Sequence, residues 1–258
     1  MLPSVDAVEH FRSVMTRSEW TLDEAALAIA AGADPTVQPG PWLAELDRLA
    51  DGVVSFETLR RRLFVEAGFA GNREHYGDPR NSLLHQVLAR RLGLPITLSV
   101  VCLEVGRRAG VTLEGVAMPG HFLVRRTGTE QCVDAFDGGE ILDLAGCEAR
   151  FRRSTGANIP FGPHLLPIAT PPAILARVLE NLRAVYRAGR PADLEWVLSM
   201  RLVLPGAGVE EAVELGEAMG RQGKWLDAAT YVESTVDSWP QHAELLSRAA
   251  RSLRARLN

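Results

Sequence analysis

The sequence predicts an α+β fold followed by an all-helical C-terminal region, and three observations support this prediction. Apolar residues recur at three- and four-residue steps as far as Gly110, which is the period of amphipathic helices. Short apolar runs separated by Pro-Gly and Gly-Gly pairs follow and indicate antiparallel strands. Helical periodicity returns at Pro172. We therefore expect an N-terminal helical segment (1–70), an α+β core (71–168) and a helical region (169–258).

The N-terminal segment is expected to form three short helices. Thr21 and Glu24 have the spacing of a capping box, in which two side chains satisfy backbone N–H groups at the start of a helix. A second helix follows from apolar residues that share one face, namely Trp42, Leu43, Leu46 and Leu49. Ser55 can cap the third helix, and Gly68 marks its end.

Two further helices are predicted at the start of the core. Asn81 or Ser82 is expected to cap the first of them, which should end at Gly93. Pro95 can open the second helix, because the first turn of a helix tolerates proline. Residues 96–109 are apolar on nearly every side in their first half. We therefore expect this helix to be buried at the centre of the core.

The period changes after Gly110, and the sequence then predicts paired strands. The runs 111–116 and 122–124 flank the turn-forming pair Pro119-Gly120. A third strand is expected at 131–136, closed by two glycines. Helices that precede a cluster of strands are typical of an α+β arrangement with an antiparallel sheet.

The C-terminal region predicts five helices separated by glycine and proline. Their ranges are 172–188, 192–203, 208–220, 224–237 and 241–256. The third and fourth form a hairpin near the repeat period of about 34 residues that is typical of stacked helical repeats. A repeat-like region and a plain helical subdomain both fit this pattern.

The composition excludes several classes of function. The 258 residues carry a net charge of −4, which argues against a general nucleic-acid binder. No apolar run is long enough to span a membrane, and the first residues do not resemble a secretory signal. The cysteines (Cys102, Cys132 and Cys147) are odd in number and lack C-x-x-C spacing, so we expect reduced thiols and a cytoplasmic protein. The histidines have no metal-ligand spacing, so we expect no metal or cofactor.

The most informative pair of residues is His121 and Asp134. His121 lies at the start of one predicted strand and Asp134 within the next. Neighbouring antiparallel strands can bring a carboxylate against an imidazole nitrogen, which orients the imidazole as a general base. The alternative is a partly buried histidine that serves only a hydrogen bond between strand and turn. Spacing alone does not separate these interpretations.

A covalent mechanism would also need a nucleophile near that histidine. The N-terminus of the 96–109 helix offers Thr97 in its first turn and Ser99 one turn inside. A threonine such as Thr97 more often caps a helix than attacks a carbonyl, and Cys102 is expected to pack in the core. Cys132 shares a strand face with Asp134, so it could approach the site or could simply pack there.

The run from Asn81 to Arg126, followed by VDAFDGGEIL, resembles the SirB-type transglutaminase-like family, which has tetratricopeptide-like C-terminal helices. Similar segments occur in certain eukaryotic F-box proteins. The resemblance implies a papain/transglutaminase-like core of helices and a small antiparallel sheet. In catalytic relatives such a core holds a Cys-His-Asp triad. It assigns His121 and Asp134 to the triad, but the standard cysteine would fall near Pro95, where this sequence has none.

Other positions match the family's own pattern and imply a retained pocket, namely Asn81, Pro95, Gly120 and Phe136, with Ser99 expected nearby. We therefore expect a module that binds a peptide or protein partner through a His-Asp cleft. The alternative is a hydrolase or acyltransferase acting on an amide or ester bond. In that case His121 is the base, Asp134 orients it, and Thr97 or an activated water attacks. Pairs of arginines could form a shared phosphate site, or could simply be solvated.

Overall fold

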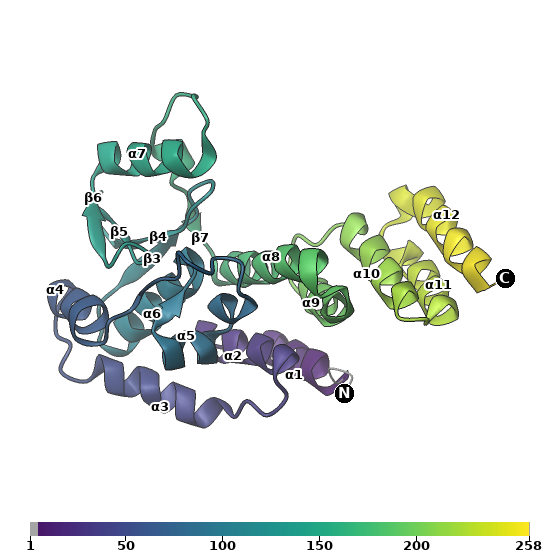
Figure 1. Ribbon diagram of the computed structural model, residues 1–258, viewed down its shortest axis with the longest axis horizontal. Coiled ribbons are helices and arrows are strands. Elements are labelled where there is room, and N and C mark those ends of the chain that lie inside the picture. The colour runs from purple at the N-terminus through teal and green to yellow at the C-terminus, as the bar shows by residue number, and fades with distance from the viewer. Residues whose placement is uncertain (1–4, 258) are drawn as a thin grey trace.

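A computed structural model describes residues 5–257 of the chain (Figure 1). The first four residues of the predicted segment 1–70 and the last residue of the region 169–258 therefore lie outside the description. The α+β core lies at one end of the molecule and the last three helices lie at the other. The predicted fold class is confirmed, because helices and a small antiparallel sheet precede a run of helices.

Residues 5–70 form four α-helices rather than three, because α1 (Val5–Thr16) precedes α2 (Leu22–Ala33), α3 (Pro39–Ala50) and α4 (Phe56–Arg60). The predicted capping box is present, and the Thr21 N–H donates to the Glu24 carboxylate at 3.3 Å. The Ser55 hydroxyl accepts from Thr58 N–H at 3.2 Å and begins α4. A π-helical turn, Arg61–Glu66, continues α4 toward Gly68.

The start of the core corrects two predicted helix ends. Asn81 and Ser82 do not cap α5 (Leu84–Arg90), because both lie in a 3₁₀ turn, Pro79–Ser82, whose own cap is Asp78. Arg91, and not Gly93, takes the left-handed conformation after α5, with φ of 60°. Gly93 lies instead in β2 (Leu92–Gly93), which pairs in parallel with β1 (Ala70–Gly71). The buried central helix is confirmed as α6 (Pro95–Arg108).

The main sheet has five antiparallel strands in the order β6-β5-β4-β3-β7. The three predicted strands are β3 (Leu113–Val116), β4 (Leu123–Arg126) and β5 (Cys132–Asp134). The sequence analysis missed β6 (Glu140–Leu142), β7 (Ile168–Ala169) and the helix α7 (Leu144–Thr155). Helix α6 packs on one face of the sheet and α7 lies over the other (Figure 1).

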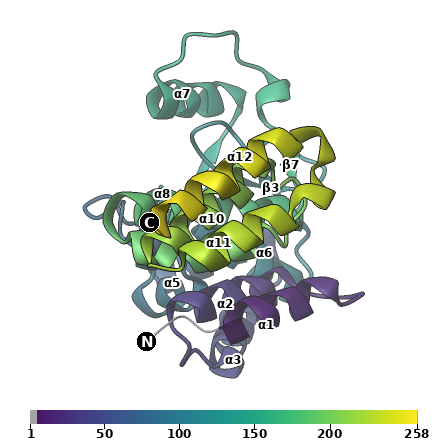
Figure 2. The same cartoon turned by 90° about the vertical axis from the view of Figure 1, so that its right-hand side faces the viewer.

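The C-terminal helices are α8 (Pro171–Gly189), α9 (Leu194–Arg201), α10 (Val209–Arg221), α11 (Trp225–Ser234) and α12 (Ala243–Arg254). All five lie close to their predicted ranges. Helices α8 and α9 pack into the same hydrophobic core as α2 and α6. Helices α10 to α12 enclose a smaller apolar cluster of their own, and Figure 2 shows them stacked side by side.

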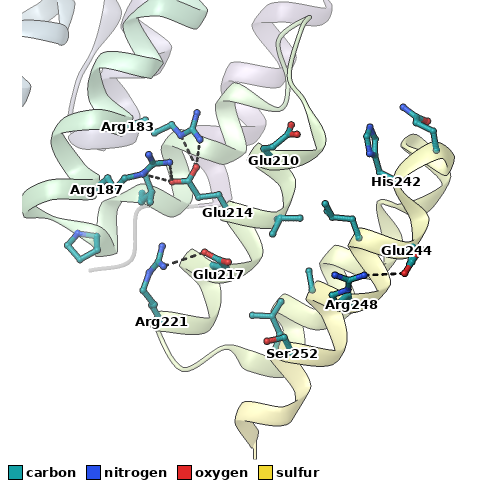
Figure 3. A pocket seen from close by; sticks show the side chains of 17 residues that line it. Arg183, Arg187, Glu210, Glu214, Glu217, Arg221, His242, Glu244, Arg248 and Ser252 are labelled. Carbon is teal, nitrogen blue, oxygen red and sulfur yellow. Dashed lines mark hydrogen bonds and ion pairs between the residues drawn. The ribbon is translucent and has the colours of Figure 1, made fainter.

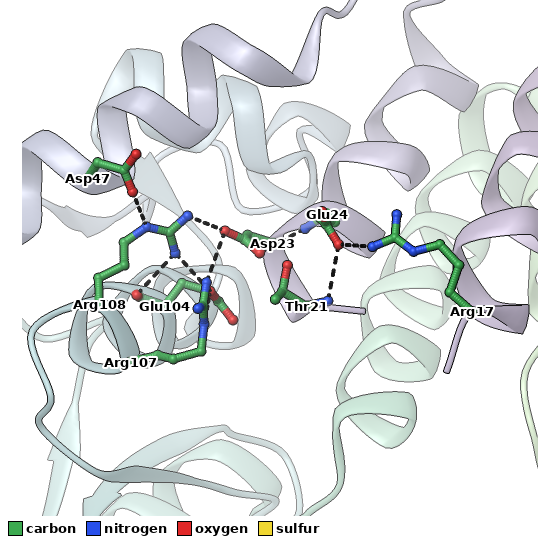
Figure 4. Close-up of polar contacts among 8 residues, drawn as sticks. All are labelled: Arg17, Thr21, Asp23, Glu24, Asp47, Glu104, Arg107 and Arg108. Atoms are coloured by element: carbon green, nitrogen blue, oxygen red, sulfur yellow. Dashed lines mark hydrogen bonds and ion pairs between the residues drawn. The ribbon is translucent and has the colours of Figure 1, made fainter. Parts of the chain in front are cut away.

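An ion cluster fixes the C-terminal end of α6 (Figure 4). Arg108 reaches Asp23 of α2 at 2.5 Å, Asp47 of α3 at 2.6 Å and Glu104 at 2.9 Å. Burial alone would raise the pKa of Asp23, but hydrogen bonds from Thr21 and Arg108 outweigh it and hold that pKa below its usual value. Burial, assisted by the Asp23 charge, raises the pKa of Glu104. The cluster therefore joins α2 and α3 to the C-terminal end of α6.

Candidate functional site

A tight turn places His121 directly before β4. The His121 N–H donates to the Met118 carbonyl at 3.0 Å, with Pro119 and Gly120 in the two central positions. Gly120 has φ of +74°, which glycine adopts without strain and which suits the third position of this turn. A Cβ atom there would also lie 2.8 Å from Thr155 at the end of α7. The predicted residue Gly120 thus shapes the backbone that carries His121.

Asp134, the last residue of β5, holds the imidazole of His121. The Nε2 atom of His121 and the Oδ2 atom of Asp134 lie 2.9 Å apart, which confirms the predicted contact. Asp134 is fully buried, and its Oδ1 accepts from the Phe136 N–H at 2.9 Å and the Asp137 N–H at 3.3 Å. An ionised carboxylate only accepts, so Nε2 is the donor in this contact, and in the neutral imidazole Nδ1 is then the nitrogen with the lone pair.

Arg150 of α7 supplies a buried positive charge to the same carboxylate. Its Nε lies 3.1 Å from Asp134 Oδ2, and its Nη2 lies 2.8 Å from Glu140. It also pairs with Asp137, which in turn pairs with Arg73. The sequence analysis missed Arg150 because it did not predict α7. The β5–β6 turn and α7 thus together hold Asp134.

Phe136 forms an aromatic wall beside His121. The two ring centres are 6.2 Å apart in an edge-on arrangement, and Tyr76 lies edge-on to Phe136 at 5.8 Å. The guanidinium of Arg73 lies 5.1 Å from the Phe136 ring centre. A Cβ atom at Gly71 would come within 2.4 Å of that ring, so only glycine permits the loop to lie this close. The predicted residue Phe136 therefore adjoins the His-Asp pair, and the sequence analysis did not place Tyr76 and Arg73 beside it.

Partial burial raises the pKa of Tyr76, and the charge of Arg177 on α8 opposes that rise. Tyr76 is 51% exposed. The loop that carries Tyr76 therefore lies within electrostatic reach of α8.

Three predicted residues are buried in the core. Asn81 is fully buried and ties the loop together, because its Nδ2 donates to the His75 carbonyl at 2.7 Å. Thr97 is 1% exposed, and its hydroxyl has no hydrogen-bond partner among residues 5–257. The Ser99 hydroxyl is fully buried and donates to the carbonyl of Pro95 at 2.8 Å. Close packing around α6 therefore encloses both hydroxyls.

The three cysteines are free and buried. Burial raises the pKa of Cys102 to about 12. Cys132 and Cys147 face each other between the sheet and α7. Their hydrogen bond lowers the pKa of Cys132 and raises that of Cys147.

A cavity of about 320 Å³ opens beside His121. The core contributes His121, Phe122 and two alanines to its wall, and the C-terminal helices contribute two more alanines with Arg177, Glu180, Arg201 and Glu211. Within the part of the chain that the structure describes, no serine, threonine or cysteine lines this cavity. The cavity is thus lined by His121 and charged residues, without a hydroxyl or thiol nucleophile.

A larger groove of about 1150 Å³ lies between α8, α10 and α12 (Figure 3). Charged pairs line it, including Arg183 with Glu214 at 2.8 Å and Arg248 with Glu244 at 3.1 Å. Apolar side chains such as Leu245, which is 46% exposed, lie between these pairs. This groove has both the size and the mixed character of a surface for an extended ligand.

Neither a metal site nor a shared arginine site is found among the described residues. No group of three His, Cys, Asp or Glu side chains in residues 5–257 is placed to hold a metal ion. Arg91 pairs with Glu45, and Arg108 pairs with Asp23, in two separate ion clusters. No helix in the described chain is long and apolar enough to cross a membrane.

Residues 23–180 match the family described as the transglutaminase-like superfamily. A UPF0162 protein from Xylella fastidiosa strain 9a5c is 40% identical over 162 residues, and the match covers 58% of each chain. A UPF0162 protein from Pseudomonas aeruginosa is 34% identical over 182 residues, covering 66% of this chain and 67% of that protein. Human F-box only protein 21 is 40% identical over 96 residues, 33% of this chain and 15% of that protein. No solved structure gives a significant match.

Proposed function

This chain belongs to the transglutaminase-like superfamily, and from that membership we propose that it is a cytoplasmic module that binds a peptide or protein segment. We place it in the SirB-type group and propose that its C-terminal helices are tetratricopeptide-like. In this proposal the bound segment occupies the cavity beside His121, and the groove of the C-terminal helices offers it a further surface. We also propose that the chain divides into three parts, namely residues 1–70, 71–168 and 169–258.

One observation carries this proposal. The cavity beside His121 has a wall from the core and a wall from the C-terminal helices, and none of the described residues places a hydroxyl or thiol in it. Covalent acyl transfer needs a nucleophile within hydrogen-bond reach of its base. A His-Asp pair without such a neighbour can still bind and orient a ligand. Binding is therefore the function that this arrangement supports best.

The groove between α8, α10 and α12 adds a second line of support. Stacked helix pairs commonly present an extended concave face to a bound segment. The groove combines charged side chains with an apolar floor that includes Val213 and Leu253. Such a surface suits a peptide with both charged and apolar residues.

A second candidate function is hydrolysis or acyl transfer at an amide or ester bond. Its support is the hydrogen bond of 2.9 Å between His121 Nε2 and Asp134 Oδ2, which leaves Nδ1 as the basic nitrogen. Because Thr97 is buried, an activated water is the better nucleophile in this alternative. A positioned base typically contributes about two to four orders of magnitude in rate.

The test combines peptide selection with a hydrolase screen on the full chain. Peptides selected from a random display library are measured for affinity to the wild-type protein, His121→Ala and, as a matched control, the exposed His10→Ala. We expect His121→Ala to weaken binding by about tenfold, with His10→Ala unchanged and no turnover of amide or ester substrates.

Two results would contradict the proposal. The first is a library from which no peptide binds the wild-type protein more tightly than the His121→Ala variant. The second is turnover by the wild-type protein that both His121→Ala and Asp134→Asn abolish, while both variants still capture the same peptides. The second result would establish the hydrolase alternative.

A further inference from the structure

We propose that the cavity beside His121 is a subsite for a carboxylate that is adjacent to an amide N–H, with Arg177 binding the carboxylate and His121 Nδ1 accepting from the N–H. This inference deepens the proposed function, on which it rests for the cavity being a ligand site. The ligand is an acidic side chain or the C-terminal residue of a peptide.

Of the four charged residues that line the cavity, three have partners among the described residues, and Arg177 has none. Glu180 pairs with Arg183 at 3.0 Å, and the Glu211 carboxylate accepts from the Gly208 N–H at 2.8 Å at the start of α10. The Arg201 guanidinium donates to the Gly206 carbonyl at 2.8 Å. Across residues 5–257, Arg177 makes no hydrogen bond or ion pair. A guanidinium without a partner is suited to hold a carboxylate through two parallel N–H groups.

The imidazole of His121 supplies the complementary acceptor. Its Nε2 is engaged by Asp134 at 2.9 Å, so the ring in its neutral form offers a lone pair at Nδ1. A lone pair accepts from an amide N–H and does not itself attract a carboxylate. The cavity therefore combines a cation, Arg177, with an acceptor, His121 Nδ1. An acylated amino acid that carries a carboxylate has the two matching groups, because its carboxylate suits the cation and its amide N–H suits the acceptor.

The dimensions of the cavity fit one residue of such a ligand. Its volume is about 320 Å³, close to the lower end of the range for small-molecule sites. Alanines at 117, 169, 173 and 176 form much of the wall, so no bulky side chain fills the space. Phe122 offers an apolar surface for the ligand's methylene groups.

The experiment uses the full chain with three small probes. N-acetyl-glutamate amide carries only a side-chain carboxylate, N-acetyl-glutamine carries only a main-chain carboxylate, and N-acetyl-glutamine amide is neutral. Binding is followed by NMR of the histidine imidazole groups, with the His121 signals assigned from their loss in His121→Gln. The variants are Arg177→Gln and, as a matched control, Arg12→Gln on α1, which is exposed and paired with Glu9.

We expect saturable shifts of the His121 signals with at least one carboxylate probe, and the stronger probe identifies the source of the carboxylate. The neutral probe and the Arg177→Gln variant should each bind about tenfold more weakly or worse, because a hydrogen bond to a charged group is lost. Arg12→Gln should bind like the wild type.

Three outcomes would overturn the inference: equal binding of the neutral probe, unchanged affinity in Arg177→Gln, or no shift with either carboxylate probe. None of them is a failure of the proposed function. If library peptides still bind in a His121-dependent manner, only the carboxylate subsite is wrong. If no library peptide binds, the proposed function itself fails.

Discussion

Arg150 Nε and His121 Nε2 converge on one oxygen of Asp134, Oδ2, at 3.1 and 2.9 Å. Arg150 comes from α7 and His121 from the turn before β4, so two separate elements fix one buried carboxylate. A carboxylate that is removed from water needs such partners, because its charge is otherwise uncompensated. The orientation of the imidazole therefore depends on α7 as well as on the sheet.

The first prediction follows from this relationship. Arg150→Met should reduce the free energy of unfolding by about 3–5 kcal/mol, because it removes the cation that pairs with the buried Asp134 carboxylate, whereas Asp137 keeps its ion pair with Arg73. Urea unfolding measures the change. The matched control is Arg152→Met on the same helix. The exposed Arg152 side chain pairs with Glu148, and its loss should reduce the free energy of unfolding by about 0.5 kcal/mol or less. A loss at Arg150 as small as the control's would mean that the Asp134 carboxylate does not need this charge.

The second prediction concerns the turn that carries His121. Gly120→Ala and Gly128→Ala both place alanine at positive φ, +74° and +80°, which should cost about 1–2 kcal/mol in each case. Only at Gly120 would the new Cβ also meet α7, at 2.8 Å from Thr155, whereas at Gly128 no described atom lies within 4 Å. Thermal unfolding should therefore give a larger loss for Gly120→Ala, by about 1–3 kcal/mol. Equal losses would show that the end of α7 moves aside.

The third prediction is a pH dependence of stability. A hydrogen bond from Arg48 and a second from Arg91 outweigh partial burial and lower the pKa of Glu45 to about 2, from 4.5. A lowered folded-state pKa stabilises the fold above the unfolded pKa, and this contribution disappears as the pH falls from about 4.5 to about 2.

Glu45→Gln should therefore cost about 1–2 kcal/mol at pH 7, less than full linkage implies because the Arg48 side chain is 61% exposed to screening solvent. The difference from wild type should shrink toward zero at the acid end of that range. Urea unfolding at several pH values measures it, with the exposed Glu9→Gln as the control. A difference that stays constant with pH would assign the effect to packing and not to charge.

The fourth prediction concerns the thiols. Iodoacetamide at neutral pH should leave all three cysteines of the native protein unmodified, because each is buried and burial raises the pKa of Cys102 to about 12. In denaturant all three should react, as measured by mass spectrometry. Ser13→Cys, at an exposed position of α1, provides a reactive control. Rapid modification of native Cys132 would make it a candidate nucleophile and would favour the hydrolase alternative.

The local part of the site could be predicted from the sequence. Pro119-Gly120 is a strong turn signal, and the apolar runs on either side predict neighbouring strands. Once those strands pair, His121 and Asp134 come within reach of each other. The turn-forming residues and the alternating pattern of the strands therefore predicted the contact between His121 and Asp134.

The remaining parts depend on tertiary contacts that local patterns do not encode. Arg150 reaches Asp134 only because α7 folds back over the sheet, and Arg177 enters the cavity from a helix 56 positions after His121. The burial of Thr97 was missed for a related reason. Its place in the first turn of α6 suggested access to a ligand, but the packing around α6 leaves it 1% exposed. The short strands β6 and β7 carry too few residues to show a period.

The last prediction tests the electrostatics of the cavity by a gain of binding. Glu180 lines the same cavity as Arg177, and its side chain is 50% exposed, so its carboxylate should repel that of a ligand. Its partner Arg183 also binds Glu214, so removing Glu180 does not leave Arg183 unpaired. Glu180→Gln should therefore strengthen binding of the carboxylate probes by about two- to fivefold, since exposed charges interact weakly.

The gain should be absent for the neutral probe, absent in Glu9→Gln, and smaller at high salt because exposed charges are screened. The double variant Arg177→Gln/Glu180→Gln should bind carboxylates far more weakly than Glu180→Gln alone, because the guanidinium that receives the ligand is gone. NMR titration of the His121 signals measures all four proteins. If Glu180→Gln weakens carboxylate binding, Glu180 contacts the ligand directly as an acceptor, and the ligand must then present a donor or cation where we place its carboxylate.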